Sequence, residues 1–222
     1  MKKLIIIGTG ETADIAYEYF TKDSDYEVKA FSVEASFITE QFYLGQPVVD
    51  LEELDKKYSI EEYEVFVALS SGKLNRNRTR LFEIVKNKGY KCANYVSSRA
   101  FIWDNVKIGE NVFIFENNVV QHKAEIGNNV ILWSGNHIGH QTKIKDNCFI
   151  SSHCVISGFC EIGENSFLGV NCTFADNIKI GKDCFIGAGA LINKDLEENS
   201  LVAVSGTEVS KVGAKRLMKV RD

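Results

Sequence analysis

The sequence lacks the features of a membrane or nucleic-acid-binding protein. No apolar run approaches the roughly 20 residues needed to span a bilayer, and the apolar stretch 4–7 is too short for the core of a secretory signal. Excess positive charge is also missing, because 26 Lys and Arg stand against 30 Asp and Glu. We therefore expect a cytoplasmic protein without a membrane or nucleic-acid partner.

Proline is nearly absent, with Pro47 as its single occurrence in 222 residues. Since proline removes a backbone donor, its scarcity suits long uninterrupted ladders of backbone hydrogen bonds. The length suits one large domain or two modest ones.

A strict six-residue repeat occupies the C-terminal half. Between Ile102 and Ile192 every sixth residue is aliphatic, except for Phe174, which is also apolar. A helical period of 3.6 cannot produce this pattern, so it predicts a triangular parallel β-helix with three hexapeptides per coil. The repeat also predicts which residues stack, because positions eighteen apart fall on the same face, about 4.8 Å apart.

A column of small residues lies four positions after the aliphatic one and includes five of the six cysteines. We interpret these cysteines as small buried hydrophobes rather than metal ligands or partners in disulfides. Glycine often follows the aliphatic residue, and we expect it to ease the bends between faces. The small column contains Cys148, Cys154, Cys160, Cys172 and Cys184, and the glycine column contains Gly109, Gly127, Gly139, Gly163, Gly169, Gly181 and Gly187.

The N-terminal half is typical of a half-Rossmann α/β domain. A strand over 3–8 runs into Gly8-x-Gly10-x-x-Ala13 and a helix through Tyr19. We assign 1–98 to this domain, 99–204 to the β-helix and 205–222 to a basic tail. Further strands are expected at 27–33, 65–69 and 91–96, and helices at 50–57 and 76–88.

The glycine-rich turn predicts a phosphate site, because backbone amides and a helix N-terminus can hold an anion there. Gly8, Gly10 and Thr12 are the candidates for the phosphates, and Glu34, after the second strand, is the candidate for the base or ribose. About 98 residues is short for a full dinucleotide fold. A nucleotide or nucleotide sugar is therefore favoured, while NAD and a purely structural turn remain alternatives.

A half-Rossmann domain followed by a hexapeptide β-helix resembles the group of sialic-acid O-acetyltransferases and bacillosamine-pathway N-acetyltransferases. The resemblance covers nearly the whole chain. It implies a left-handed β-helix and a homotrimer that uses acetyl-CoA. The implied acceptor is a nucleotide-linked amino-deoxysugar, such as a 4-amino-4,6-dideoxyhexose, in surface polysaccharide, lipopolysaccharide or glycan biosynthesis.

Individual residues match motifs of that group. His140, in the stretch 135–141, matches the proton-accepting histidine, and Gly158 matches the glycine whose amide faces the acetyl carbonyl. The residue after the histidine is often an acid in the group, whereas here it is Gln141, so the orienting partner of the base is not identified. Further matches imply contacts of Val170 and Ala188 with the pantetheine arm and of Arg78 with a phosphate. The C-terminal segment departs from the pattern of the group, and its basic residues Lys211 and Lys215 are the candidates for contacts with the rest of CoA.

The eighteen-residue rule places His122, His140 and Gly158 in one column, so that His140 lies about 5 Å from Gly158. An imidazole, with an ordinary pKa of roughly 6.5, suits acceptance of a proton from an attacking amine. Direct attack then needs no covalent intermediate. His137 is the alternative base or an orienting group, and His153 is expected on a different face.

Three other functions stay open from the sequence. A γ-type carbonic anhydrase shares the β-helix but needs a different histidine spacing, and we expect no metal. A non-enzymatic β-helix used as a rigid binding wall is a distant alternative. Among transferases, O-acetylation of a sialic-acid-like sugar competes with the favoured N-acetylation.

Overall fold

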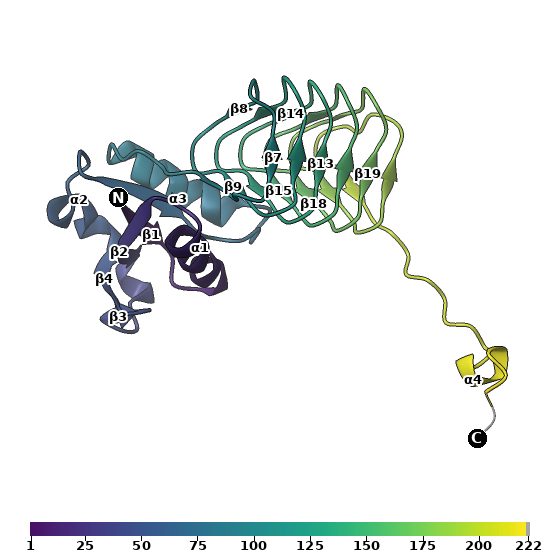
Figure 1. Cartoon of the computed structure of the whole chain (residues 1–222), viewed down its shortest axis with the longest axis horizontal. Helices are drawn as coiled ribbons and strands as arrows, with labels where there is room; N and C mark the ends of the chain where they lie inside the picture. The colour runs from purple at the N-terminus through teal and green to yellow at the C-terminus, as the bar shows by residue number, and fades with distance from the viewer. Residues whose placement is uncertain (221–222) are drawn as a thin grey trace.

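The computed structural model describes residues 1–220. A small α/β domain holds the N-terminus, a triangular β-helix follows, and a C-terminal segment extends away from the far end of the β-helix (Figure 1). The predicted fold class is thereby confirmed.

The N-terminal domain contains short helices around one sheet. Its elements are β1 (Lys2–Ile7), α1 (Glu11–Lys22), β2 (Tyr26–Val33), the 3₁₀ turn η1 (Ala35–Phe37), β3 (Phe42–Tyr43), β4 (Gln46–Asp50), the 3₁₀ turn η2 (Leu51–Glu53), α2 (Leu54–Lys57), β5 (Tyr63–Val67) and α3 (Arg76–Asn87).

The sheet has the order β3-β4-β2-β1-β5, and only the β3–β4 pair is antiparallel. Alternate residues of β1 point to opposite faces. Leu4 and Ile6 pack with α1, whereas Ile5 and Ile7 pack with α2 and α3. The β3–β4 hairpin is not predicted by the sequence pattern, and the strand expected over 91–96 is reduced to a bridge at Cys92 and a short strand that joins the β-helix.

The β-helix has three faces, each a sheet of two-residue parallel strands. The first face contains β7 (Phe101–Ile102), β10 (Val119–Val120), β13 (His137–Ile138), β16 (Val155–Ile156), β19 (Thr173–Phe174) and β22 (Leu191–Ile192). The second contains β8 (Lys107–Ile108), β11 (Glu125–Ile126), β14 (Lys143–Ile144), β17 (Glu161–Ile162) and β20 (Lys179–Ile180). The third contains β6 (Tyr95–Val96), β9 (Phe113–Ile114), β12 (Ile131–Leu132), β15 (Phe149–Ile150), β18 (Phe167–Leu168), β21 (Phe185–Ile186) and β23 (Leu201–Val202).

Strand pairing confirms the predicted stacking of residues eighteen apart, as in the pair His137 and Val155. The first strand of the third face, β6, pairs with β9, so the ladder already begins at Tyr95, three residues before the boundary expected from the sequence. The position of the boundary between the two domains therefore stays a prediction.

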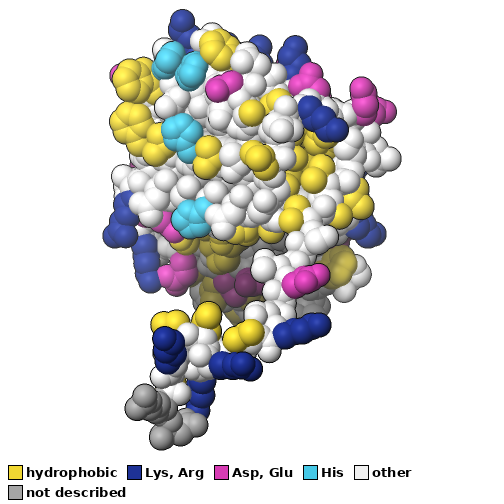
Figure 2. Space-filling model, turned by 90° about the vertical axis from the view of Figure 1, so that its right-hand side faces the viewer, with side chains coloured by type: hydrophobic (Ala, Val, Ile, Leu, Met, Phe, Trp, Pro, Cys, Tyr) yellow, Lys and Arg dark blue, Asp and Glu magenta, His cyan; other side chains and the backbone are white. Residues whose placement is uncertain are grey.

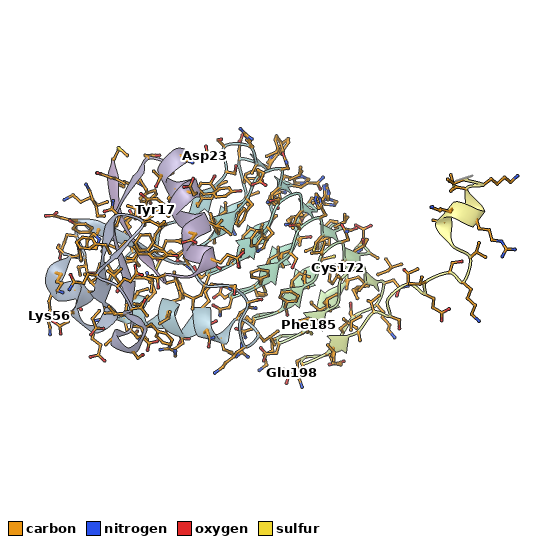
Figure 3. The ribbon with its side chains drawn as sticks, turned by 90° about the horizontal axis from the view of Figure 1, so that it is seen from below. Tyr17, Asp23, Lys56, Cys172, Phe185 and Glu198 are labelled. Carbon is orange, nitrogen blue, oxygen red and sulfur yellow. The ribbon has the colours of Figure 1, made fainter. Side chains whose placement is uncertain are left out.

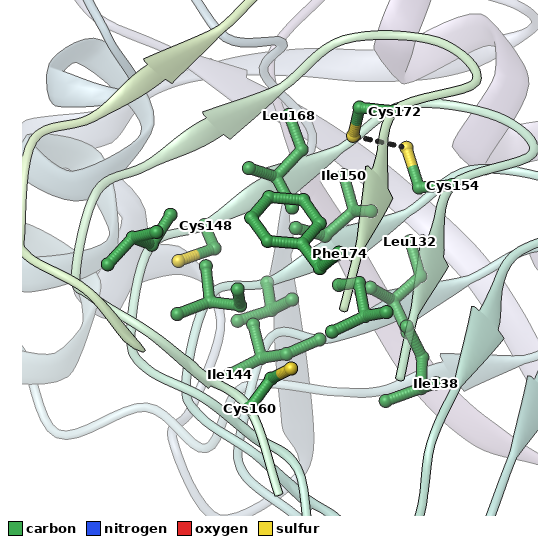
Figure 4. Packing of buried hydrophobic residues seen from close by; sticks show 14 of the residues in the cluster. Leu132, Ile138, Ile144, Cys148, Ile150, Cys154, Cys160, Leu168, Cys172 and Phe174 are labelled. Carbon is green, nitrogen blue, oxygen red and sulfur yellow. Dashed lines mark hydrogen bonds between the residues drawn. The ribbon is translucent and has the colours of Figure 1, made fainter. Parts of the chain in front are cut away.

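The interior of the β-helix is filled by the aliphatic and small columns. Figure 4 shows Ile138, Ile150, Leu168 and Phe174 converging there, and all four are fully buried. The cysteines of the small column are also buried and carry free thiols. Burial raises the pKa of the Cys148 thiol to about 12, which keeps it protonated and unreactive at neutral pH.

The expectation that glycine eases the bends is wrong. The left-handed backbone falls two residues after the glycine column and is mostly occupied by asparagine, as at Asn129 and Asn147. The glycine column instead lets adjacent coils approach, because a Cβ at Gly139 would lie 2.5 Å from the carbonyl carbon of Ser157. The same applies to Gly169, where a Cβ would lie 2.6 Å from the next coil.

The third face carries the N-terminal domain. Phe20 of α1 packs against Phe113, and the outward column of this face becomes exposed away from the joint, from 0 % at Phe113 to 41 % at Phe185. Where α1 ends, Asp23 accepts hydrogen bonds from the Tyr95 hydroxyl (2.6 Å) and the Ser98 amide (3.0 Å). Figure 3 shows Asp23 where the N-terminal domain meets the β-helix, and Phe185 farther along the β-helix.

Beyond β23 the chain leaves the β-helix and forms the short helix α4 (Ala214–Leu217). Within residues 1–220, no helix has the length and apolar character that crossing a membrane requires.

Candidate functional site

The candidate base lies at the corner between the first and second faces, which we call the His140 corner. His122 and His140 stack with ring centroids 5.5 Å apart and planes 11° from parallel. The ring of His140 lies against Gly158, where a Cβ would be 2.6 Å from its Cε1 atom. The structure therefore brings the predicted column together, and only glycine at 158 leaves room for the imidazole.

The orienting partner that the sequence did not identify is Gln121. Its Oε1 atom accepts from the backbone amide of His140 at 2.9 Å and lies 3.3 Å from His140 Nδ1. The ring lies against Gly158, where a Cβ would be 2.8 Å from the other ring nitrogen, Nε2, and 3.0 Å from Nδ1. The eighteen-residue rule could have identified Gln121, because it places residue 121 one coil behind Gly139 and therefore beside His140.

The predicted role of Gly158 needs a correction. Its amide donates to Asp176 Oδ1 at 2.9 Å, and the amide of Gly139 donates to the Ile156 carbonyl at 2.7 Å. The His140 amide is taken by Gln121. In this structure the Gly158 amide is thus occupied by a carboxylate and does not face an open position for an acetyl carbonyl.

The remaining histidines lie at different places. His137, the alternative base, is in strand β13 and faces outward from the first face. His153 lies at the corner between the third and first faces, where its ring covers Gly135. Figure 2, which looks from the C-terminal end, shows histidine side chains gathered on one side of the molecule among hydrophobic ones.

A second candidate region is a cavity of about 650 Å³ in the N-terminal domain. The predicted phosphate turn lines it through Gly8, Gly10 and Thr12. Gly8 has φ of +124°, and Gly10 begins α1 without a side-chain cap, so the first turn of the helix is open to a ligand. The buried Ser32 hydroxyl also lines the cavity and has no hydrogen-bond partner within residues 1–220.

Charged residues lie at the edge of this cavity. Glu34 lines it as predicted and forms two hydrogen bonds with Arg80, at 2.9 and 2.7 Å. The Arg80 guanidinium holds the pKa of the Glu34 carboxyl below its usual value. Lys73 also lines the cavity, so Arg80 and Lys73 are the cations placed to meet a phosphate. Neither residue is among those predicted from the sequence.

The prediction that Arg78 contacts a phosphate is wrong. Its side chain is completely buried between α3 and the β-helix, away from the cavity. Its guanidinium donates to the carbonyl oxygens of Ser70 (2.9 Å) and Asn147 (3.2 Å) and to the Asn129 side chain (3.2 Å). Burial lowers its pKa to about 10, so it stays charged at neutral pH and acts as a structural link between the domains.

The predicted CoA contacts are not brought to His140 within one chain. Val170 and Ala188 lie on the corner between the third and first faces, at the opposite edge of the first face. Lys211 and Lys215 lie in the C-terminal segment that extends away from the β-helix (Figure 1). These four contacts stay predictions.

The two candidate regions also lie on different sides of the molecule. The N-terminal domain packs on the third face, whereas the His140 corner joins the other two faces. Within the described part of the chain, no cluster of three or more His, Cys, Asp or Glu side chains is arranged to hold a metal ion.

Comparison with known proteins agrees with this architecture. A family model described as bacterial transferase hexapeptide (six repeats) matches residues 105–140, 123–158 and 159–194. A search of curated proteins found no match.

Solved structures resemble nearly the whole chain. A histidine-to-asparagine variant of perosamine N-acetyltransferase from Caulobacter crescentus, in complex with CoA and GDP-perosamine, is 25 % identical with a TM-score of 0.80, covering 90 % of this chain and 93 % of that one. The acetyltransferase domain of PglB from Neisseria gonorrhoeae is 25 % identical with a TM-score of 0.81, covering 92 % and 97 %. WeeI from Acinetobacter baumannii shares the fold at 17 % identity and a TM-score of 0.78, covering 92 % and 97 %. These likenesses confirm the predicted resemblance: the chain carries bacterial transferase hexapeptide repeats, and we conclude that it is an acyltransferase.

Proposed function

We propose that this chain is a cytoplasmic N-acetyltransferase that moves an acetyl group from acetyl-CoA to the amine of a nucleotide-linked amino sugar. The observation that carries the proposal is His140, whose Nδ1 lies 3.3 Å from Gln121 Oε1 while its ring lies against Gly158. Support also comes from the likeness to a structure that holds CoA and GDP-perosamine, in which a histidine has been replaced. A 4-amino-4,6-dideoxyhexose is the acceptor we favour.

In the proposed reaction the neutral sugar amine attacks the thioester carbonyl carbon. The new C–N bond forms as the carbonyl π electrons move to oxygen, and the C–S bond breaks when the tetrahedral intermediate collapses. His140 Nε2 takes the proton that the amine loses and then returns it to the leaving thiolate. All atoms balance without a covalent enzyme intermediate.

The N-terminal cavity is the proposed site for the nucleotide. Amides at the start of α1 suit the diphosphate, and Arg80 and Lys73 supply positive charge beside it. The unpartnered Ser32 hydroxyl offers a further hydrogen bond. Glu34 provides an acceptor for a ribose or base once it shares Arg80 with the ligand.

We also propose a homotrimer, and the separation of the two regions supports a site shared between copies. The sugar of a nucleotide bound in one chain would meet the His140 corner of a neighbouring copy rather than its own. The first face, beside that corner, carries an outward apolar column with Phe101, Val155 and Leu191 at 54, 40 and 68 % exposure. Packing of a second copy against this column would bury it.

Mixed oligomers test the shared site. A His140→Ala chain and a Gly10→Trp chain, each inactive alone, should regain activity when co-expressed, because some interfaces then combine an intact corner with an intact cavity. Activity no higher than the sum of the two single variants, in complexes shown to contain both chains, would contradict a shared site.

The function itself is tested by release of free thiol from acetyl-CoA with a panel of UDP-, dTDP- and GDP-linked 3-amino- and 4-amino-6-deoxysugars. Turnover with one member would fix the nucleotide and the amine together. Silence across the panel with intact acetyl-CoA binding would favour O-acetylation of a sialic-acid-like sugar. A chain that does not bind CoA would refute the transferase proposal and leave a β-helix binding module.

A further inference from the structure

At some corners of the β-helix, the second amide after a strand is held by a side chain of the next coil. At the corner between the second and third faces, the amide of Glu110 donates to Asn128 Oδ1 at 2.9 Å, and the amide of Asn128 donates to Asp146 Oδ1 at 2.7 Å. In each case the acceptor comes from the equivalent residue one coil ahead. The amide of Gly158 follows the same pattern with Asp176.

His140 departs from this pattern. The equivalent residue one coil ahead is Gly158, which has no side chain to offer an acceptor. Gln121 replaces it from the coil behind, and its Oε1 atom accepts from the His140 amide at 2.9 Å. The same oxygen lies 3.3 Å from His140 Nδ1, so one atom contacts both the backbone and the ring.

The backbone contact decides the tautomer of the ring. A backbone N–H can only donate, so the atom of Gln121 that faces it must be the oxygen and not the amide nitrogen. An oxygen in turn requires that Nδ1 carry the proton. In the neutral imidazole, the second ring nitrogen, Nε2, then carries the lone pair.

We propose that Gln121 is the positioning residue of the site: it holds His140 in the Nδ1–H tautomer with Nε2 free to accept a proton. The consequence for catalysis rests on the proposed function of His140 as the base, whereas the tautomer does not. Because the acceptor is a neutral amide, it orients the ring without the stabilisation that a carboxylate would give to the imidazolium.

Other ionisable groups surround the ring. His122 stacks on it from the coil behind, and Asp176 lies one coil beyond Gly158. Lys123 and Lys143 line the hollow beside Gln141 and Phe159, and the Phe159 ring meets His140 edge-on.

Two substitutions in the full-length protein test the proposal. Gln121→Leu removes the acceptor at similar size, and Gln121→Glu makes it a carboxylate. Gln141→Glu is the matched control, since it adds the same charge one residue from His140, where no hydrogen bond to the ring exists. Nitrogen-15 NMR of the imidazoles reports the tautomer, and thiol release across pH 5.5–9 reports the rate.

We expect the wild-type ring to show Nδ1–H and Gln121→Leu to lose that preference, with kcat about tenfold or more lower and KM for acetyl-CoA within twofold. In Gln121→Glu the tautomer should persist, while the acid limb of the rate profile moves up by about one pH unit. Gln141→Glu should move the limb clearly less.

Two results would overturn the proposal: an Nε2–H tautomer in the wild type, or an unchanged tautomer in folded Gln121→Leu. Equal shifts of the acid limb in Gln121→Glu and Gln141→Glu would show that the contact between residue 121 and the ring does not cause the shift. Failure of the proposed function is distinguishable, because it leaves the NMR result intact while thiol release stays absent in every variant.

Discussion

Two corners of the same β-helix have nearly the same backbone but opposite surroundings. The corner between the second and third faces, which we call the asparagine corner, carries Asn111, Asn129 and Asn147, linked side chain to side chain at 2.9 and 2.8 Å. The His140 corner carries no N-terminal domain against it. The repeat therefore fixes the backbone geometry of both corners. Whether the N-terminal domain covers a corner decides whether its side chains are buried or open to a ligand.

The covered corner is a buried polar joint. Arg78 lies against it without a carboxylate partner, and its charge is satisfied by carbonyl and amide oxygens. At the open corner, two imidazoles stack and the His140 ring lies against a glycine. Satisfied polar groups stabilise the covered corner, whereas the open corner leaves a ring nitrogen that we propose as the base.

The largest expected effect breaks the covered corner. Arg78→Met removes a buried charge and leaves several carbonyl oxygens without donors, so we expect a loss of about 3 kcal/mol or more in the free energy of unfolding. Urea unfolding followed by aromatic fluorescence measures it. Arg76→Met is the matched control, because the exposed ion pair of Arg76 with Asp183 should contribute at most about 1 kcal/mol. Equal losses in the two variants would refute the structural role of Arg78.

The next effect removes the proposed base at the open corner. His140→Ala should lower kcat about a hundredfold or more, because the attacking amine then loses its proton acceptor. Affinity for acetyl-CoA, measured by calorimetry, should stay within a few fold, and the thermal midpoint should change little. Turnover within threefold of the wild type would exclude His140 from the role.

A third change makes the open corner resemble the covered one. Gly158→Asn places a side chain where the other corner has Asn128, and its Cβ would meet the His140 ring at 2.6 Å. The backbone φ at 158 is not left-handed, so the fold should tolerate it while the ring is displaced. We expect kcat to fall about tenfold or more with an unchanged circular dichroism spectrum. Gly206→Asn, where a Cβ meets no atom within 4 Å, is the control, and equal activity of the two variants would contradict the prediction.

The two corners also differ in how much of their structure could be predicted from the sequence. Period six and the eighteen-residue rule predict every face of the β-helix and the column of His122, His140 and Gly158, because each residue there contacts its sequence equivalents. Gln121 follows the same rule, but its role depends on a side-chain rotamer, which a spacing does not encode.

Long-range contacts could not be predicted from the sequence, because they depend on how distant elements pack together. A charged residue at the start of a helix is expected to be exposed. Arg78 is buried because α3 packs onto the asparagine corner. The β3–β4 hairpin is missed because its strands are short and their pairing depends on β2. The amide of Gly158 is likewise occupied by Asp176, a contact that a family motif does not reveal.

The smallest effect sharpens the comparison at the first coil, where Asp23 holds α1 to the β-helix. Hydrogen bonds from Ser98 and Tyr95 lower the pKa of its carboxyl to about 2. Because the folded pKa lies below the ordinary value of about 3.9, its stabilisation is present above pH 4 and is lost as the pH falls toward 2. Asp23 is partly exposed, so we expect Asp23→Asn to cost only about 1 kcal/mol at pH 7. Urea unfolding at pH 7, 4 and 2.5 should show the deficit shrinking with acid, whereas Asp25→Asn should show none, and a deficit independent of pH would assign the effect to packing instead of charge.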